Sequence, residues 1–209
     1  AMKEKPPADF TERELMVITA AREIRDGDVV FVGMRLPLIA FAFAKRTHAP
    51  GAIGLFENGV VRDQPAPETL MTMSDTPNIP GATWCTGTLE IMALLQQGLV
   101  DLGFIGGAEI DRFGNLNTSC IGDWRRPKVR LPGSGGGGDI ASLARRFVVI
   151  MPQEKHRFLL GEGVPGQNGL GRQEGQGRAA ETALKIIGVV SGRLGLAAQQ
   201  RFQLGLEFL

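Results

Sequence analysis

Cysteine is scarce in this chain, which has only Cys85 and Cys120 among its 209 residues. The two are isolated and form no Cys-x-x-Cys pair, so the sequence indicates no disulfide framework. A chain of this length can bury a hydrophobic core that needs no disulfide cross-links. Isolated cysteines are typical of a reducing compartment, and we expect a cytoplasmic location.

Histidine is equally scarce, with His48 and His156 as the only two. Their spacing does not suit a shared metal ion, so we expect no metal site. A Ser/His/Asp triad stays open as an alternative, although no motif marks one.

The chain also lacks an excess of one charge and any long apolar run. Lys and Arg total 23 against 22 Asp and Glu, a balance that argues against nucleic-acid binding. No apolar stretch reaches the length needed to span a bilayer, and a charged N-terminal segment with Pro6 and Pro7 does not suit a signal peptide. We therefore expect neither nucleic acid nor a membrane as partner.

What the chain does have is an alternation of helical and strand patterns. Thr11 and Glu14 form a capping box that predicts the start of a helix. A buried strand is then expected at Val29–Gly33, a helix at Leu36–Lys45 and a second strand at Ile53–Phe56. This order predicts an α/β fold with an open, mostly parallel sheet flanked by helices.

Further along, three segments carry specific expectations. Val61–Pro80 contains four prolines and predicts a long loop, and long loops in compact domains are often functional. Leu102–Ile110 predicts one strand, with a bulge or a close backbone approach at Gly106 and Gly107. Phe147–Met151 is a continuous β-rich run and predicts a buried strand.

Length and a hydrophobic content of 43% predict a single domain over residues 1–209. Within it, residues 161–178 form a Gly- and Gln-rich segment that we expect to be flexible. Ile186–Val190 and Phe202–Phe208 are predicted to pair as two strands.

Glu57 is the main candidate for catalysis. It follows the predicted strand Ile53–Phe56 and precedes Asn58-Gly59, a common turn pair. A carboxylate at this place is either part of an ordinary turn or a group presented to a cleft, since ligands bind at strand ends in α/β sheets. Gly59 permits a sharp turn that projects Glu57, and the Asn58 side chain can donate a hydrogen bond to a carbonyl oxygen.

A glycine cluster downstream is the second candidate. Residues 133–139 read Gly-Ser-Gly-Gly-Gly-Gly-Asp, and the backbone N–H groups of residues 135–138, which lack side chains, can approach a ligand closely. With Asp139 as cap of a following helix, the loop would favour an anion. It matches neither the P-loop nor the dinucleotide fingerprint, and a plain linker is the alternative.

Several motifs occur in an order that is more specific than any one of them. They run from Gly51 to Phe158, after an upstream Leu-Pro-Leu-Ile at 36–39 and Ala-Lys-Arg at 44–46. They are Glu57–Gly59, Phe104–Asp111, Phe113–Asn117, Ile121–Asp123, Gly133–Gly136 and Glu154–Phe158. In this arrangement the chain resembles the β subunit of family I coenzyme A transferases, closest to the glutaconate type, over roughly three quarters of its length.

The resemblance implies an open α/β sheet of the CoA-transferase and sugar-phosphate-isomerase kind, and a partner α subunit of the same fold in a heteromer. It implies that Glu57 is the nucleophile, which attacks an acyl-CoA thioester and gives a glutamyl-CoA thioester. Asn58, Gly59, Gly133, Gly135 and Gly136 would form the oxyanion and CoA loop. Coenzyme A would be a substrate, with no permanently bound cofactor.

One departure from this pattern, and one related branch of the fold, leave alternatives open. The Gly- and Gln-rich segment after Phe158 differs from the Ser-Pro-Gly continuation of the glutaconate type. A branch of similar fold hydrolyses ring-derived CoA thioesters and lacks the glutamate in its β chain, so Glu57 favours transfer. A subunit of an acyl-CoA hydrolase and a non-catalytic scaffold are the other hypotheses.

Overall fold

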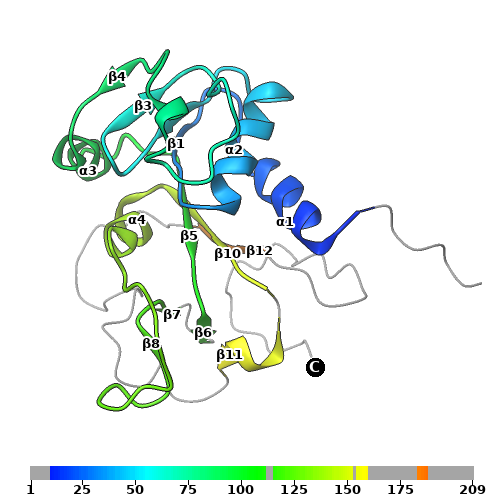
Figure 1. The fold of residues 1–209 in the computed structure, drawn as a ribbon, viewed down its shortest axis with the longest axis vertical. Helices are drawn as coiled ribbons and strands as arrows, with labels where there is room; N and C mark the ends of the chain where they lie inside the picture. Colours follow the sequence, from blue (N-terminus) through cyan, green and yellow to red (C-terminus); the bar gives the residue numbers. More distant parts are fainter. Residues whose placement is uncertain (1–9, 112–114, 153, 160–182, 188–209) are drawn as a thin grey trace, which may run out of the picture.

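The computed structural model describes residues 10–111, 115–152, 154–159 and 183–187. Figure 1 shows a sheet with helices on both sides, and a second group of short strands below it. The helices are α1 Glu12–Ala21, α2 Leu36–Arg46, α3 Thr88–Gln96 and α4 Gly137–Leu143, with 3-10 turns at Thr76–Asn78 and Lys155–Arg157. The strands are β1 Val29–Phe31, β2 Ile53–Leu55, β3 Val60–Arg62, β4 Trp84–Cys85, β5 Leu102–Gly106, β6 Glu109–Asp111, β7 Leu116–Asn117, β8 Cys120–Ile121, β9 Val129–Arg130, β10 Arg146–Ile150, β11 Phe158–Leu159 and β12 Ala183–Ile187.

The main sheet has seven strands in the order β12-β10-β5-β1-β2-β3-β4. The first five are parallel, with Phe31 opposite both Leu55 and Gly103, and β3 and β4 complete one edge in antiparallel fashion. Buried parallel strands of this kind need helices on both faces. The predicted fold class, an open and mostly parallel sheet flanked by helices, is confirmed.

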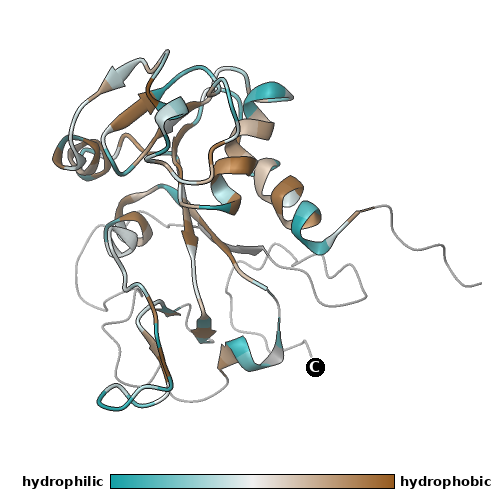
Figure 2. Ribbon diagram, in the orientation of Figure 1, coloured by the Kyte–Doolittle hydropathy of each residue, from teal (hydrophilic) through white to brown (hydrophobic). Residues whose placement is uncertain are grey.

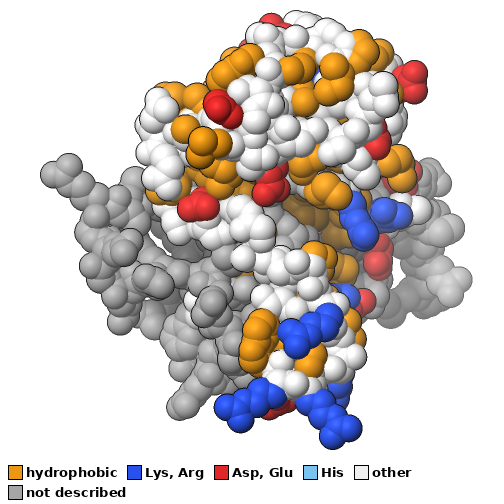
Figure 3. Space-filling model, turned by 60° about the vertical axis from the view of Figure 1, so that its left-hand side comes forward, with side chains coloured by type: hydrophobic (Ala, Val, Ile, Leu, Met, Phe, Trp, Pro, Cys, Tyr) orange, Lys and Arg blue, Asp and Glu red, His pale blue; other side chains and the backbone are white. Residues whose placement is uncertain are grey.

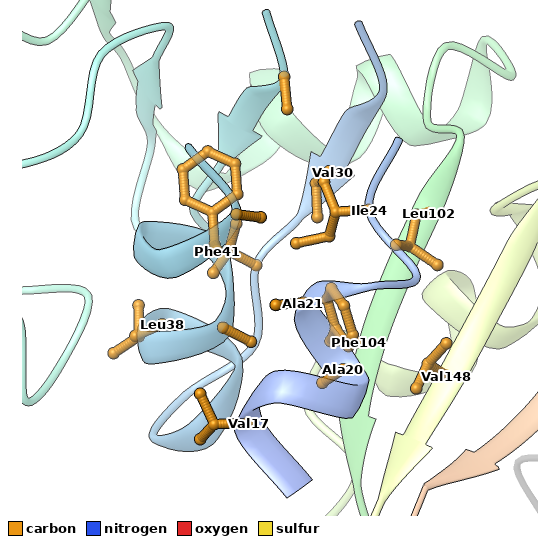
Figure 4. Close-up of a cluster of buried hydrophobic side chains, with 14 of the residues drawn as sticks. Val17, Ala20, Ala21, Ile24, Val30, Leu38, Phe41, Leu102, Phe104 and Val148 are labelled. Atoms are coloured by element: carbon orange, nitrogen blue, oxygen red, sulfur yellow. The ribbon is translucent and has the colours of Figure 1, made fainter. Parts of the chain in front are cut away.

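Two hydrophobic clusters lie on opposite faces of the sheet. Helices α1 and α2 supply Ala20, Ala21, Leu38 and Phe41 to one cluster, which Figure 4 shows against residues of β1, β5 and β10. Helices α3 and α4 supply residues such as Ile91 to the other cluster. Figure 2 shows hydrophobic residues in brown between paler and teal ones along the helices. These short helices are therefore stabilised mainly by the packing of their apolar faces against the sheet, and not by the intrinsic stability of a long helix.

The start of the first helix agrees with the sequence. Thr11 caps α1, its hydroxyl accepts a hydrogen bond from the Glu14 amide, and the Glu14 carboxylate accepts one from the Thr11 amide at 2.6 Å. Satisfying these backbone donors lowers the pKa of Glu14, first through the Thr11 backbone bond.

The single strand predicted over Leu102–Ile110 is wrong. Strand β5 ends at Gly106 in the main sheet, and β6 begins at Glu109 in a separate three-stranded sheet with β7 and β11. The expected close approach at Gly107 is present, because a Cβ there would lie 2.2 Å from Leu116 Cδ1. The chain bends at the two glycines and changes sheet.

Other boundaries also shift. The predicted loop Val61–Pro80 is shorter at its start, since its first two residues belong to β3. Near the other end of the chain, β12 covers Ala183–Ile187 and pairs in parallel with β10. The strand expected at 186–190 is thus displaced, and its proposed partner at 202–208 lies outside the described residues, as does the segment 161–178.

Candidate active site

Glu57 lies in the tight turn that joins β2 to β3. The Gly59 amide donates to the Phe56 carbonyl at 2.9 Å, and the Phe56 amide donates to the Val60 carbonyl at 2.9 Å. Because β2 is parallel to β1 and β5, this turn stands at the edge of the sheet where their carboxyl ends meet. That edge is where open α/β sheets bind ligands.

Gly59 is required in this turn for two reasons. Its φ of +102° lies in the left-handed region that disfavours other residues. A Cβ added here would also lie 2.1 Å from the Thr86 carbonyl oxygen. The Thr86 amide donates to the Gly59 carbonyl at 2.8 Å, so the turn is fastened to the segment that enters α3. The role of Gly59 in the structure is to hold the shape of the turn.

Asn58 is engaged with the neighbouring loop. Its Nδ2 donates to the Met73 carbonyl at 2.9 Å, and its Oδ1 accepts from the Val60 amide at 3.4 Å. Asn78 donates to the same Met73 carbonyl at 2.7 Å. The side chain predicted to contact a substrate carbonyl thus connects the Glu57 turn to the loop after β3.

The glycine loop lies directly against Glu57. A Cβ added at Gly136 would be 3.2 Å from Glu57 Oε1, and one added at Gly135 would be 3.7 Å away. Met92 of α3 closes another side, with its Cε 3.3 Å from the same Gly136 position. The structure therefore brings together two candidates that lie far apart in the sequence, and a side chain at Gly136 would crowd the carboxylate.

The backbone of the loop is bent into this position. Gly135 has a φ of +50°, the Gly133 amide donates to the Thr118 carbonyl at 2.9 Å, and the Gly137 amide donates to the Ser134 carbonyl at 2.8 Å. The expectation that Asp139 caps the following helix is wrong. Helix α4 starts two residues before Asp139, Gly136 occupies the capping position, and no side chain bonds there.

The Glu57 carboxylate is half-buried and, within the described ranges, receives no hydrogen bond and forms no ion pair. By contrast, the buried charged side chains among the described residues, Lys45, Arg62 and Asp111, all form hydrogen bonds. Arg62 donates to the carbonyls of Gln64, Pro65, Asn78 and Pro80. A carboxylate beside the backbone of Gly135 and Gly136, with the Met92 thioether on another side, suits nucleophilic attack on a carbonyl.

The loop after β3 is built around Arg62, which is only 2% exposed. Burial lowers the pKa of its guanidinium, an effect that Asp63 partly opposes. On the α2 side of this loop lies a cavity of about 560 Å³, lined mostly by apolar side chains such as Phe43 and Leu70. Phe56 lines the cavity, whereas Glu57 does not.

Sequence reasoning missed one contributor to the site and one strained residue at the same sheet edge. Met92 lies on α3, and only the packing of α3 against α4 shows that it faces the glycine loop. Arg35 follows β1 at the same sheet edge as Glu57 and has a φ of +64°, a strained value for a residue with a side chain. No sequence signal marks that strain.

Nothing in the described part of the chain groups three or more His, Cys, Asp or Glu side chains as a metal site. His48 instead bridges α1 and α2, with Nε2 3.0 Å from the Ala21 carbonyl. Of the helices described, none has both the length and the apolar character to cross a membrane.

Comparisons with known proteins agree with this arrangement. The family model described as coenzyme A transferase matches residues 13–159. The β subunit of the 3-oxoadipate CoA-transferase of Pseudomonas knackmussii is 38% identical over 151 residues, which cover 72% of this chain and 58% of the relative. The β subunit of the glutaconate CoA-transferase of Acidaminococcus fermentans is 36% identical over 156 residues, again 72% and 58%.

Solved structures give the same picture. The glutaconate coenzyme A-transferase structure from Acidaminococcus fermentans superposes with a TM-score of 0.67 at 33% identity, covering 72% of this chain and 59% of that one. The decarboxylase AibA/AibB superposes with a TM-score of 0.66 at 31% identity, covering 74% and 65%. This chain thus spans less than two thirds of the relatives it matches. The chain belongs to the coenzyme A transferase family, among relatives that are β subunits of its enzymes.

Proposed function

We propose that the chain is the β subunit of a CoA transferase, which moves CoA from an acyl-CoA to a free carboxylic acid through a thioester on Glu57. The observation that carries the proposal is the unpaired Glu57 carboxylate, whose Oε1 lies beside the Gly135 and Gly136 positions. Family membership supports the same chemistry.

In the first half-reaction the Glu57 carboxylate attacks the thioester carbonyl of the acyl-CoA. The C–S bond breaks, CoA leaves as the thiolate, and an acyl-glutamyl anhydride remains. The thiolate then attacks the glutamyl carbonyl, which releases the first carboxylate and leaves a glutamyl-CoA thioester. Backbone N–H groups of the glycine loop stabilise the oxyanion at each addition.

The second half-reaction reverses these steps with another acid. The acceptor carboxylate attacks the glutamyl-CoA carbonyl and expels the thiolate, which then attacks the acyl carbonyl of the new anhydride. Glu57 is released as a carboxylate and the acceptor leaves as its CoA ester. Water must be kept out while these intermediates exist, and Met92 lies on one side of the site to do so.

The partner and the acids complete the proposal. Each of the two transferase relatives is named as one subunit of its enzyme, so the active species is a heteromer with an α subunit of similar fold. The loop that follows β3, held by Arg62 and by Asn58, contributes to the choice of acid. A cytoplasmic location stays a prediction from the isolated cysteines.

A trapping experiment tests the covalent step. The assembled complex is incubated with acyl-CoA, then with borohydride or hydroxylamine, and digested for mass spectrometry. We expect modification of Glu57 that depends on acyl-CoA and is absent from Glu57→Gln. Glu12→Gln, an exposed carboxylate on α1, serves as the matched control and should still be trapped at Glu57.

The fold also occurs in the decarboxylase AibA/AibB, so activities other than transfer need separate measurements. A decarboxylase releases carbon dioxide, and an acyl-CoA hydrolase releases free CoA without an acceptor acid. Transfer requires a second carboxylate and conserves the thioester. Turnover without an acceptor, with no adduct on Glu57, would overturn the proposed function.

A further inference from the structure

A basic hairpin, residues 120–130, projects from the smaller group of strands at the end away from α2 (Figure 1). Strands β8 and β9 form it, with Cys120 opposite Arg130 and Ile121 opposite Val129. The Lys128 amide donates to the Ile121 carbonyl at 2.9 Å and extends the pairing. The hairpin is therefore an ordered, exposed projection.

Four cations lie on this hairpin: Arg125, Arg126, Lys128 and Arg130. All four are exposed, and within the described ranges none forms an ion pair. The nearest acid in sequence, Asp123, accepts from the amides of Arg125 and Arg126 at 2.8 and 3.2 Å and so is engaged with backbone. Figure 3 shows Lys and Arg side chains gathered at the lower end of the molecule.

Other arginines differ from these. Arg145 pairs with Asp101 at 3.0 Å, Arg146 with Asp28 at 2.6 Å, and Arg157 with Glu154 at 2.7 Å. A concentration of unpaired positive charge on one projection attracts a polyanion. The balanced net charge of +1 hides this local excess.

An aromatic ring accompanies the charges. Trp124 is 50% exposed, and the Arg130 guanidinium lies 5.1 Å from the centroid of its ring. The cation–π contact with Arg130 fixes the orientation of the Trp124 ring. The exposed indole then offers a surface on which a base can stack. Exposed aromatic and phosphate-binding groups together suit a nucleotide better than a simple acid.

The hairpin leads directly to the glycine loop. After β9, the Leu131 amide donates to the Ser119 carbonyl and the Gly133 amide to the Thr118 carbonyl, both at 2.9 Å. From Arg130 to Gly135 the chain spans at most about 17 Å. A ligand with one end at Glu57 and a long flexible arm can therefore reach the hairpin with its other end.

We propose that the basic hairpin binds the phosphorylated adenosine end of coenzyme A while its thioester lies at Glu57. Arg125, Arg126, Lys128 and Arg130 contact the phosphates, and Trp124 stacks on the adenine. This proposal rests on the proposed function, because it takes coenzyme A as the substrate. The pantetheine arm then runs along the segment from Leu131 to the glycine loop.

The test compares two donors that differ only in the nucleotide: an acyl-CoA and the corresponding acyl-pantetheine. In the assembled complex, Arg125→Glu/Arg126→Glu should raise KM for acyl-CoA about tenfold, which corresponds to about 1.4 kcal/mol. KM for acyl-pantetheine and both kcat values should stay within about twofold. Arg22→Glu/Arg25→Glu makes the same charge change at exposed positions at the end of α1 and should alter neither donor.

Trp124 has its own pair of variants. Trp124→Ala should raise KM for acyl-CoA about fivefold through lost stacking, and Trp124→Phe should restore most of the affinity. Equal loss with both donors, or dissociation of the complex in the charge-reversed variant, would assign the hairpin to contacts with the α subunit and overturn the proposal. An unchanged KM for acyl-CoA in the charge-reversed variant overturns it as well.

A binding measurement separates this proposal from the reaction itself. The chain has two tryptophans, so Trp84→Phe leaves Trp124 as its only one. Adenosine 3′,5′-bisphosphate should quench the fluorescence of this full chain saturably, and far less so after Arg125→Glu/Arg126→Glu. If the bisphosphate quenches Trp124 fluorescence but the complex transfers no CoA, the proposed function alone is overturned. If the complex transfers CoA but the fluorescence is not quenched, the hairpin proposal is overturned.

Discussion

Two hairpins of this protein, β2–β3 and β8–β9, are built in opposite ways. In the first, Phe56 is buried, Gly59 is packed against Thr86, and Asn58 is bonded to the Met73 carbonyl. In the second, two-residue strands flank a connection that carries most of the exposed cations and the half-exposed Trp124. The first hairpin fixes the turn that carries Glu57, the proposed nucleophile, as a catalytic role would require. The second presents charge to the solvent, as capture of a soluble anion requires.

The two hairpins also differ in the free-energy cost of burying their polar side chains. In the first hairpin the Asn58 side chain has partners for both its amide nitrogen and its oxygen, whereas the Glu57 carboxylate, among the side chains described in that turn, has neither a hydrogen bond nor an ion pair. Even partial burial of a polar group without a partner costs free energy, which supports the proposed role of the Glu57 carboxylate. Exposed cations on the second hairpin carry no such cost.

The largest effect is expected from Glu57→Gln. It removes the nucleophile while it keeps size and hydrogen-bonding capacity, so CoA transfer should fall by roughly 10³ or more. Thermal unfolding should change little, because the carboxylate has no partner to lose among the described residues. Steady-state kinetics of the assembled complex and a melting curve check both parts. Retained transfer would show that the rigid hairpin serves only as scaffold.

Gly59→Ala should lower the stability of the protein by straining the turn between β2 and β3. The new Cβ would meet the Thr86 carbonyl oxygen at 2.1 Å at a φ of +102°, and we expect a loss of about 3 kcal/mol in the free energy of unfolding. Gly98→Ala is the matched control, since Gly98 has a φ of +72° but no atom within 4 Å of its Cβ position. The control should cost about 1 kcal/mol. Equal losses in chemical denaturation would mean that the Thr86 contact is unimportant.

Arg62→Met tests the loop that adjoins the first hairpin. Removal of the guanidinium leaves the carbonyls of Gln64, Pro65, Asn78 and Pro80 without that donor, for an expected loss of about 2–3 kcal/mol. Limited proteolysis should then cut within residues 63–80. Arg22→Met, at an exposed position, should leave both stability and the proteolytic pattern unchanged.

Acid should loosen the same loop. The Asp75 carboxylate accepts from the Thr72 and Met71 amides and from the Thr72 hydroxyl, and these bonds, led by the Thr72 amide, lower the pKa of Asp75. A carboxyl group whose pKa is lower in the folded than in the unfolded state contributes to stability at pH values above its unfolded-state pKa. That contribution is lost as the pH falls through its folded-state pKa. The protection of the Met71 and Thr72 amides, measured as the hydrogen-exchange rate relative to the intrinsic rate at the same pH, should fall at low pH. Asp75→Asn should remove this pH dependence of the protection.

The smallest effect concerns the second hairpin. KM for acyl-CoA should rise a few-fold as ionic strength increases from about 0.05 to 0.5 M, because salt screens exposed charges. The slope should flatten in Arg125→Glu/Arg126→Glu and stay unchanged in Arg22→Glu/Arg25→Glu. If KM depends on ionic strength equally in both double variants, the exposed cations of the second hairpin do not attract the substrate, and the contrast between the two hairpins fails.

Short-range sequence patterns were enough to predict several helices and strands of this protein. The capping box at Thr11, the helix after Arg35 and the strands on either side of it follow from short-range spacing, because helix and strand periodicity is local. The ordered motifs around Glu57 were enough to indicate the family. The strand change at Gly106 and Gly107 was missed, since a continuous apolar run does not show which sheet each part joins.

The tertiary structure alone decided which distant groups meet. The strand order places the turn after β2 beside the loop before α4, so that Glu57 and Gly136 become neighbours, and the packing of α3 brings Met92 to the same point. It also turned Asn58 toward Met73 and left the cations of the second hairpin without ion pairs among the described residues. Such contacts depend on how sheets and helices assemble over long sequence separations, and no spacing within the chain encodes them directly.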